Sequence, residues 1–143
     1  YFLLSVILFN GDMMISLIKR ISALALTLAA ATSFATAPAY LVTHNNTNEE
    51  SNAFIAGVPS IYPTPAQSTK QVYWNLVKIA CYGHTNGKEC PAVIKMATNT
   101  PQPVVLGTVI LNIDTGDINP KTLSGNGYTL IVNGPGEATI VKN

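Results

Sequence analysis

The chain has 143 residues, of which 48% are hydrophobic and only 10% are charged, and its formal net charge is +1. That small excess comes from the N-terminal region, where Lys19 and Arg20 outnumber Asp12. From residue 40 onward the lysines and the acidic residues balance, and there is no arginine. A neutral domain without arginine has neither the field that gathers nucleic acid or anionic lipid nor the usual bidentate ligand for phosphate or carboxylate, so such ligands are disfavoured. Composition therefore excludes nucleic acid as a partner.

Residues 13–39 have the layout of a secretory signal peptide. Residues 13–20 are basic, residues 21–31 are uncharged and apolar, and small residues continue to Ala39. Residues 1–12 precede this signal and are interpreted as an over-extended upstream segment. We expect cleavage after Ala39, with Ala35 as the alternative, and no stable membrane anchor afterwards. The sequence thus predicts one exported domain, residues 40–143, that is periplasmic or extracellular.

The first part of this domain predicts short strands joined by polar or proline-rich loops. Residues 40–44 and 53–58 are β-like, and residues 45–52 between them are polar and turn-forming. This polar stretch contains the N-glycosylation acceptor pattern Asn45-Asn46-Thr47, which matters only in a eukaryotic source. Three prolines in residues 59–68 predict an ordered loop and not a strand within a ladder.

Residues 71–81 are compatible with either a helix or a strand. A helix is favoured by Ser68 and Gln71, which form a capping-box pattern, and by Gly83, a candidate C-terminal stop. A strand is favoured by the β-branched and aromatic residues of the segment. We take the strand interpretation, with residues 90–98 as the returning strand of a hairpin.

The C-terminal part gives a cleaner pattern. Residues 104–113 predict a strand, residues 114–117 a turn, and residues 128–132 and 138–142 a hairpin across Asn133-Gly134-Pro135-Gly136. The total is about seven short strands separated by turns. That number predicts an all-β domain, either a small antiparallel β-sandwich of Ig-like or Greek-key type or a small barrel.

Cys81 and Cys90 are the only cysteines of the chain. A pair of cysteines in an exported protein predicts a disulfide. Closing a loop this short stabilises a domain by about 2–3 kcal/mol in the chain-entropy model.

The predicted function is a non-enzymatic binding, interaction or structural module whose partner is a protein or a glycan. Trp74 is assigned to the core, because burial is the common use of a large apolar side chain. The candidate contact residues lie beside the proline-rich loop, on it, or near the cysteine pair; they are Tyr62, Tyr73, Tyr82 and His84. No cofactor and no metal are expected.

The alternative is a small secreted hydrolase or a copper- or zinc-binding protein. Asp114-Thr115-Gly116 resembles the catalytic triplet of aspartic proteases, in which paired carboxylates activate water, although Asp and Gly are also the preferred residues of a turn. Cys81 and His84, with Met96 beyond, resemble the copper loop of cupredoxins. A zinc site would use Cys81, His84, Cys90 and His44.

Overall fold

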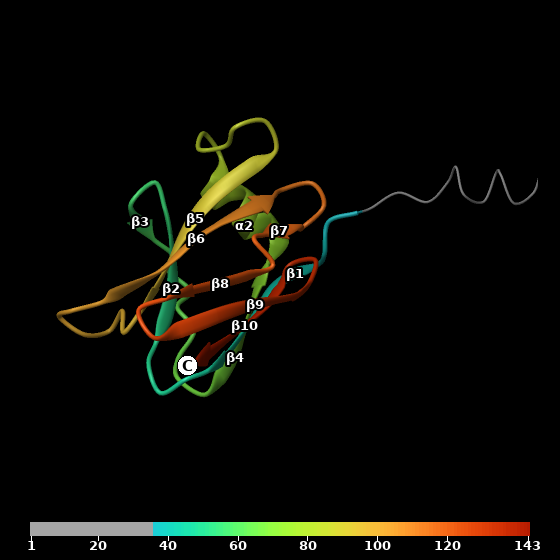
Figure 1. Cartoon of the computed structure of the whole chain (residues 1–143). Coiled ribbons are helices and arrows are strands. Elements are labelled where there is room, and N and C mark those ends of the chain that lie inside the picture. Colours follow the sequence, from blue (N-terminus) through green and yellow to red (C-terminus); the bar gives the residue numbers. More distant parts are fainter. Residues whose placement is uncertain (1–35) are drawn as a thin grey trace, which may run out of the picture. The chain divides into compact units, whose positions relative to one another are not determined.

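The computed structural model describes residues 36–143 as two five-stranded sheets and one short helix (Figure 1). The predicted upstream segment, and the predicted signal peptide up to residue 35, lie outside the described residues. One sheet has the strand order β4-β1-β10-β9-β8, and the other has the order β3-β2-β5-β6-β7. The strands are β1 Tyr40–Asn46, β2 Ser51–Ile55, β3 Val58–Pro59, β4 Ser68–Tyr73, β5 Glu89–Met96, β6 Val104–Asn112, β7 Ile118–Asn119, β8 Thr122–Gly125, β9 Tyr128–Gly134 and β10 Glu137–Lys142.

The all-β prediction is confirmed, but the sheets are not purely antiparallel. Strand β1 pairs in parallel with β10, with Thr43 opposite Ala138, and every other ladder is antiparallel within residues 36–143. Strand β1 is therefore held between its parallel neighbour β10 and its antiparallel neighbour β4. The parallel pairing of β1 with β10 joins the two ends of the domain, so no short turn connects the strands and no local sequence signal predicts it.

The core lies between the sheets, with Met96, Leu106 and Ile140 among its most deeply buried side chains. The core side chains come from alternate positions along the strands. In β10, for example, Ala138 and Ile140 are buried and their neighbours are partly exposed. Strand β6 of one sheet contacts β8 of the other. There a Cβ added to Gly125 would overlap the Leu106 carbonyl oxygen, so the backbones approach closely. We call this the closed side.

The strand predicted over residues 71–81 is wrong beyond Tyr73. Strand β4 ends there, and helix α2, Trp74–Cys81, follows at once. The helix buries Trp74, Val77 and Cys81, a spacing that makes one helical face, and the Trp74 indole N–H donates to the Ile113 carbonyl at 2.9 Å. Burial of this face outweighed the β propensity of its residues. Trp74 is thus in the core, as predicted.

The two ends of α2 explain why the sequence was ambiguous. The Ser68 and Gln71 pair lies in β4 and caps nothing; the first backbone N–H of the helix, from Trp74, instead donates to the Ala39 carbonyl at 3.0 Å. At the other end Gly83 has φ +79°, which fits the predicted stop. The helix signals were correct at its C-terminus only.

Three other predictions, one of a strand pairing and two of strand boundaries, differ from the structure. Strand β5 pairs with β2 and β6, so it is not the partner of residues 71–81. Ala56 and Gly57, both at positive φ, turn the chain within the predicted strand 53–58 and divide it into β2 and β3. Pro59 is part of β3, where an edge position tolerates a residue without an N–H. Residues 36–143 therefore form ten strands where the sequence suggested about seven.

The predicted strand 104–113 and the hairpin of β9 and β10 are confirmed. Within residues 36–143 we find no helix with the length and apolar character needed to cross a membrane.

Candidate functional site

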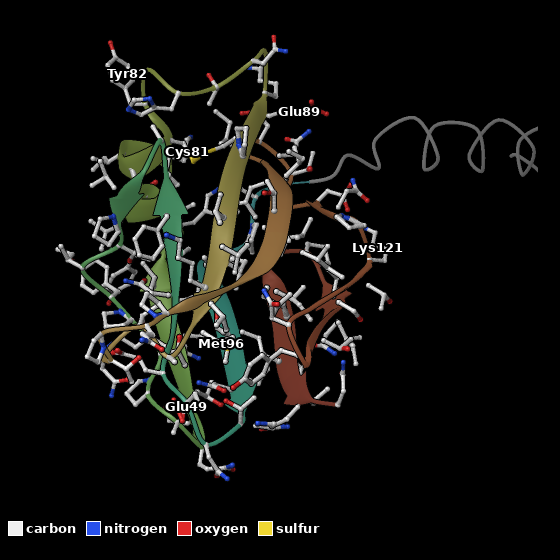
Figure 2. All side chains as sticks on the ribbon, turned by 60° about the vertical axis from the view of Figure 1, so that its left-hand side comes forward. Glu49, Cys81, Tyr82, Glu89, Met96 and Lys121 are labelled. Atoms are coloured by element: carbon white, nitrogen blue, oxygen red, sulfur yellow. A yellow bond between two sulfur atoms is a disulfide. The ribbon has the colours of Figure 1, made fainter. Side chains whose placement is uncertain are left out.

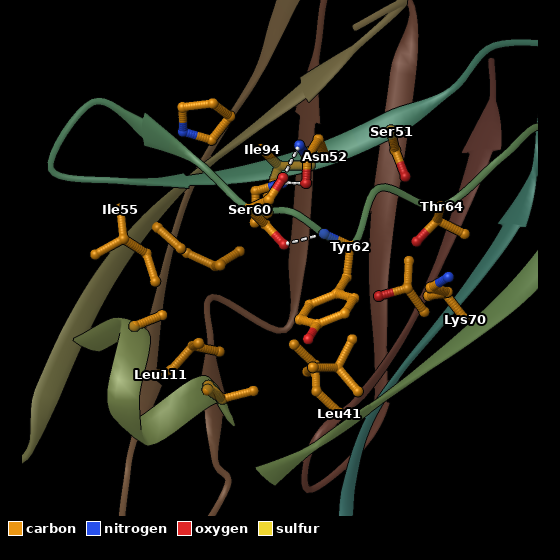
Figure 3. A pocket seen from close by; sticks show the side chains of 18 of the residues that line it. Leu41, Ser51, Asn52, Ile55, Ser60, Tyr62, Thr64, Lys70, Ile94 and Leu111 are labelled. Atoms are coloured by element: carbon orange, nitrogen blue, oxygen red, sulfur yellow. Dashed lines mark hydrogen bonds between the residues drawn. The ribbon is translucent and has the colours of Figure 1, made fainter. Parts of the chain in front are cut away.

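A pocket of about 430 Å³ lies between the two sheets, away from the closed side (Figure 3). We call this region the open side. Both sheets and helix α2 contribute to its wall, which is mostly aliphatic. Its apolar lining includes Leu41, Ile55, Val58, Val72, Leu76, Val77, Ile79, Ile94, Val109, Leu111, Ile118, Leu130 and Ile140.

Several polar side chains also line the wall, and three of them lie along one side. Figure 3 shows Ser51, Thr64 and Lys70 along one side of the pocket, with Ile55 and Leu111 on the opposite side. Alternation explains why Lys70 lies there: Lys70 and Val72 are partly buried on β4, whereas Thr69 and Gln71 are exposed. The charged side chain therefore occupies the inner face of an edge strand.

Tyr62 stands between the polar and the apolar side (Figure 3). Its backbone N–H donates to Ser60 Oγ at 2.9 Å, and the Ser60 carbonyl accepts a hydrogen bond from Asn52 Nδ2 at 2.8 Å. The bond from Asn52 attaches the loop after β3 to strand β2, and the bond between Tyr62 and Ser60 orders the loop itself. The loop thereby places Tyr62 in the pocket wall.

The loop is held at its far end by a fully buried asparagine. Asn45 Nδ2 donates to the carbonyls of Glu49, Thr64 and Pro65 at 2.8, 3.2 and 3.2 Å. Its Oδ1 accepts from the backbone N–H and the hydroxyl of Thr47 at 3.1 and 2.7 Å. The sequence showed Asn45 only as part of a turn and of a glycosylation pattern. The folded structure uses it to join the end of β1 to the pocket wall at Thr64.

The predicted disulfide joins Cys81 to Cys90 with a Cα–Cα distance of 5.9 Å, and both residues are fully buried (Figure 2). It does not close a hairpin, as the sequence suggested. It ties the last residue of α2 to β5 instead. Because α2 carries Leu76 and Ile79 of the pocket wall, the bond fixes that wall against the sheet.

The structure brings two of the four predicted contact residues to this pocket. Tyr62 and the exposed His84 line it. Tyr82 is 87% exposed and lines a second, more open hollow of about 580 Å³ with Lys78 and Ile79. Figure 2 shows Tyr82 pointing away from the rest of the domain.

The fourth predicted contact residue, Tyr73, lies elsewhere on the surface. Its ring is tilted against that of Tyr40, with centroids 5.0 Å apart. A hydrogen bond that the protonated Tyr40 hydroxyl donates to Tyr73, followed by charge repulsion between the two phenolates, raises the pKa of Tyr40 above its ordinary value. The aromatic residues therefore do not form one platform.

Most of the residues proposed for the alternative chemistry already have other partners. Asp114 lies in an exposed turn, with a carboxylate oxygen 3.1 Å from Lys88 Nζ. His44 Nε2 lies 2.6 Å from Glu137 Oε2, and its Nδ1 lies 2.9 Å from the Thr69 hydroxyl. Residues 36–143 contain no cluster of three or more His, Cys, Asp or Glu side chains suited to a metal ion.

Comparison with known proteins identifies relatives that are substrates of a secretion system. Residues 14–143 match the family model described as "T2SS substrate NttC". A solved structure, that of the Legionella pneumophila type II secretion system substrate NttC, is 66% identical with a TM-score of 0.73. The match covers 75% of this chain and the whole of that one. None of the curated proteins matches the chain.

Proposed function

The chain belongs to the NttC family of type II secretion substrates and is an exported protein; from that premise we propose that its domain is a non-enzymatic binding module, which takes an apolar small molecule or chain in the pocket between the sheets. A protein exported in this way acts outside the cytosol, where free amphiphiles and lipids are available as ligands.

The pocket is the observation that carries this proposal. Its volume of about 430 Å³ lies in the range of small-molecule sites, roughly 300–1,000 Å³. Such sites combine aliphatic walls with a few polar groups that orient the ligand. Here the aliphatic wall comes from both sheets, and Ser51, Thr64 and Lys70 supply the polar groups.

A binding role is favoured over catalysis by the surroundings of the reactive side chains. Asp114 lies outside the pocket and is paired with Lys88. The sulfur atoms of Cys81 and Cys90 are bonded to each other. His84, the one ionisable imidazole at the pocket, stands there without an acid partner in residues 36–143. General acid–base or nucleophilic chemistry needs such groups to be within hydrogen-bond reach of each other. His44, Thr69 and Glu137 meet that condition, but they lie outside the pocket.

Binding of the neutral fluorophore N-phenyl-1-naphthylamine tests the proposal. We expect its emission to rise with the mature secreted protein and to fall in Ala53→Phe, because Ala53 lines the pocket on the inner face of β2. Ile131→Phe is the matched control, since Ile131 is 40% exposed on β9 and lies outside the pocket. Equal emission from both variants, or no emission above buffer for the wild type, would contradict the proposal.

A second candidate is recognition of a protein or glycan by the hollow beside Tyr82. The observation that favours it is the exposure of Tyr82 and Ile79, which are 87% and 69% exposed. Aromatic side chains of this kind dominate many recognition surfaces. A glycan array probed with the wild type, with Tyr82→Ala and with the control Tyr73→Ala tests this role. Signals that Tyr82→Ala does not reduce would contradict it.

A further inference from the structure

The charge of the pocket wall is one-sided. Among the described residues, Lys70 is the only lysine that lines it, and no aspartate or glutamate does so. In residues 36–143, salt bridges involve His44, Lys88 and Lys121, and Lys70 has no acidic partner. Lys95 and Lys142 lie over aromatic rings, whereas Lys70 does not. A positive charge on the inner face of a sheet thus faces the pocket without compensation.

Two hydroxyl-bearing side chains share that side of the pocket with Lys70. Ser51 and Thr64 exchange both backbone hydrogen bonds, at 3.0 and 2.8 Å, and are 2% and 5% exposed. Their side chains line the pocket next to Lys70 (Figure 3). An ammonium group beside two hydroxyl donors is suited to a carboxylate or another small anionic group.

We propose that the ligand is an anionic amphiphile, with its head group at Lys70, Ser51 and Thr64 and its apolar chain directed toward Ile55 and Leu111. This inference rests on the proposed binding function and adds the ligand's class and orientation. Apolar walls alone would accept any hydrophobic chain, whereas the uncompensated Lys70 selects chains that carry negative charge.

Calorimetric titration with three ten-carbon ligands tests this orientation: decanoate, decan-1-ol and decylammonium. They share one chain and differ in head charge. We expect decanoate to bind about tenfold or more tightly than decan-1-ol, the size of effect that a charge-assisted hydrogen bond gives, and decylammonium to bind most weakly. Lys70→Met should abolish the preference for decanoate while binding of decan-1-ol persists. Lys78→Met is the control, because Lys78 lies on α2 but outside this pocket.

The outcomes separate the two proposals. Equal affinity for decanoate and decan-1-ol, or a decanoate preference that survives Lys70→Met, overturns the anionic head-group assignment and leaves the binding function standing. Failure of all three ligands to bind overturns the binding function itself. Co-sedimentation with phosphatidylcholine vesicles, with and without phosphatidylglycerol, separates the sources of the anion: binding that needs phosphatidylglycerol and Lys70 identifies a membrane lipid, and its absence beside decanoate binding identifies a free amphiphile.

A separate observation concerns the start of the mature domain. Ala37 packs against the core, and the Ala39 carbonyl accepts the hydrogen bond from Trp74 N–H. Pro38 lies so close to two turns that a Cβ added to Gly136 would be 2.6 Å from its ring, and one added to Gly116 would overlap it. Residues before Tyr40 are thus built into the fold.

We infer that signal cleavage occurs after Ala35, at Ser33-Phe34-Ala35, and that Thr36 is the first mature residue. This sequence satisfies the small-x-small rule, and the cut keeps the contacts of Ala37, Pro38 and Ala39. Intact mass and N-terminal sequencing of secreted protein test it, with Thr36 expected first and Tyr40 as the result that overturns it. A variant engineered to begin at Tyr40 should melt at lower temperature than one that begins at Thr36, and equal melting would remove the structural reason for the site.

Discussion

The two sides of the space between the sheets are built in opposite ways. On the closed side, β6 and β8 approach so closely that only glycine fits at residue 125, and a Cβ at Gly107 would be 2.7 Å from Leu123. On the open side, the edge strands β3 and β4 are bridged by a loop and a helix, and a pocket of about 430 Å³ remains. One side is closed by backbone contact, and the other is kept open by side chains that hold the loop and the helix in place.

This difference indicates that close packing on the closed side stabilises the domain, whereas the open side has space for a ligand. Close-packed interiors respond to a change of a single methyl group, whereas a pocket wall accepts added volume at the expense of the ligand. The supports of the open side are the Asn45 hydrogen bonds and the Cys81–Cys90 bond. Substitutions should therefore have different consequences on the two sides.

The largest effect is expected from Asn45→Ala, which removes the support of the open side. The substitution removes five hydrogen bonds: the carbonyls of Glu49, Thr64 and Pro65 each lose one donor, and the backbone N–H and hydroxyl of the buried Thr47 lose the Asn45 acceptor. We expect a loss of about 3–5 kcal/mol in the free energy of unfolding, because each intramolecular hydrogen bond contributes about 1 kcal/mol net. Chemical denaturation measures this loss. Asn48→Ala, at an exposed position nearby, should change stability by less than about 0.5 kcal/mol, and similar losses for both would contradict the role of Asn45.

Gly125→Ala tests the closed side. The new Cβ would overlap the Leu106 carbonyl oxygen, so the two sheets must separate. We expect a loss of about 2–3 kcal/mol, as for other overpacked sites. Gly134→Ala is the matched control, since a Cβ there meets nothing within 4 Å and the residue has no positive φ. A thermal or denaturant melt of Gly125→Ala that coincides with that of Gly134→Ala would refute the close approach.

Ala53→Val places extra volume on the open side, where the pocket can accept it. We expect the free energy of unfolding to stay unchanged or to rise by up to about 1 kcal/mol, because the substitution fills a cavity with a residue of high β propensity. Binding of N-phenyl-1-naphthylamine should weaken in parallel. Destabilisation comparable to that of Gly125→Ala would mean that the open side is as tightly packed as the closed side.

The smallest effect is expected at Asp117, in the exposed turn after β6. A hydrogen bond from Lys121, with a smaller contribution from Asn119, lowers the pKa of Asp117 below its usual value of 3.8. The pair therefore stabilises the fold fully above that value, and the contribution is lost as pH falls through the lowered pKa. Asp117→Asn should cost less than about 0.5 kcal/mol at neutral pH, because the pair is exposed. Stability curves of the two proteins should converge as pH falls below the lowered pKa of Asp117, and a gap that widens toward acid would contradict the direction of the shift.

Local patterns predicted the elements of this domain that depend on neighbouring residues. Residues 104–113 and the hairpin across Asn133-Gly134-Pro135-Gly136 were correct, because alternation and turn chemistry act over a few residues. Residues 74–81 were wrong as a strand, because their Val and Ile favour β structure locally while the helix buries one face against both sheets. Of the candidate contact residues, Tyr62 and His84 reached the pocket and Tyr73 and Tyr82 did not.

The sequence by itself determined that the protein is exported, the neutral charge of residues 40–143, the all-β class and the disulfide pairing, since each depends on composition or on residues close in the chain. Only the tertiary structure decided that β1 pairs with β10, that Asn45 supports the pocket loop, and that Lys70 faces the pocket. These features depend on contacts between residues far apart in the chain. No local pattern encodes which distant carbonyl an asparagine will meet, or which space a lysine on an edge strand will face.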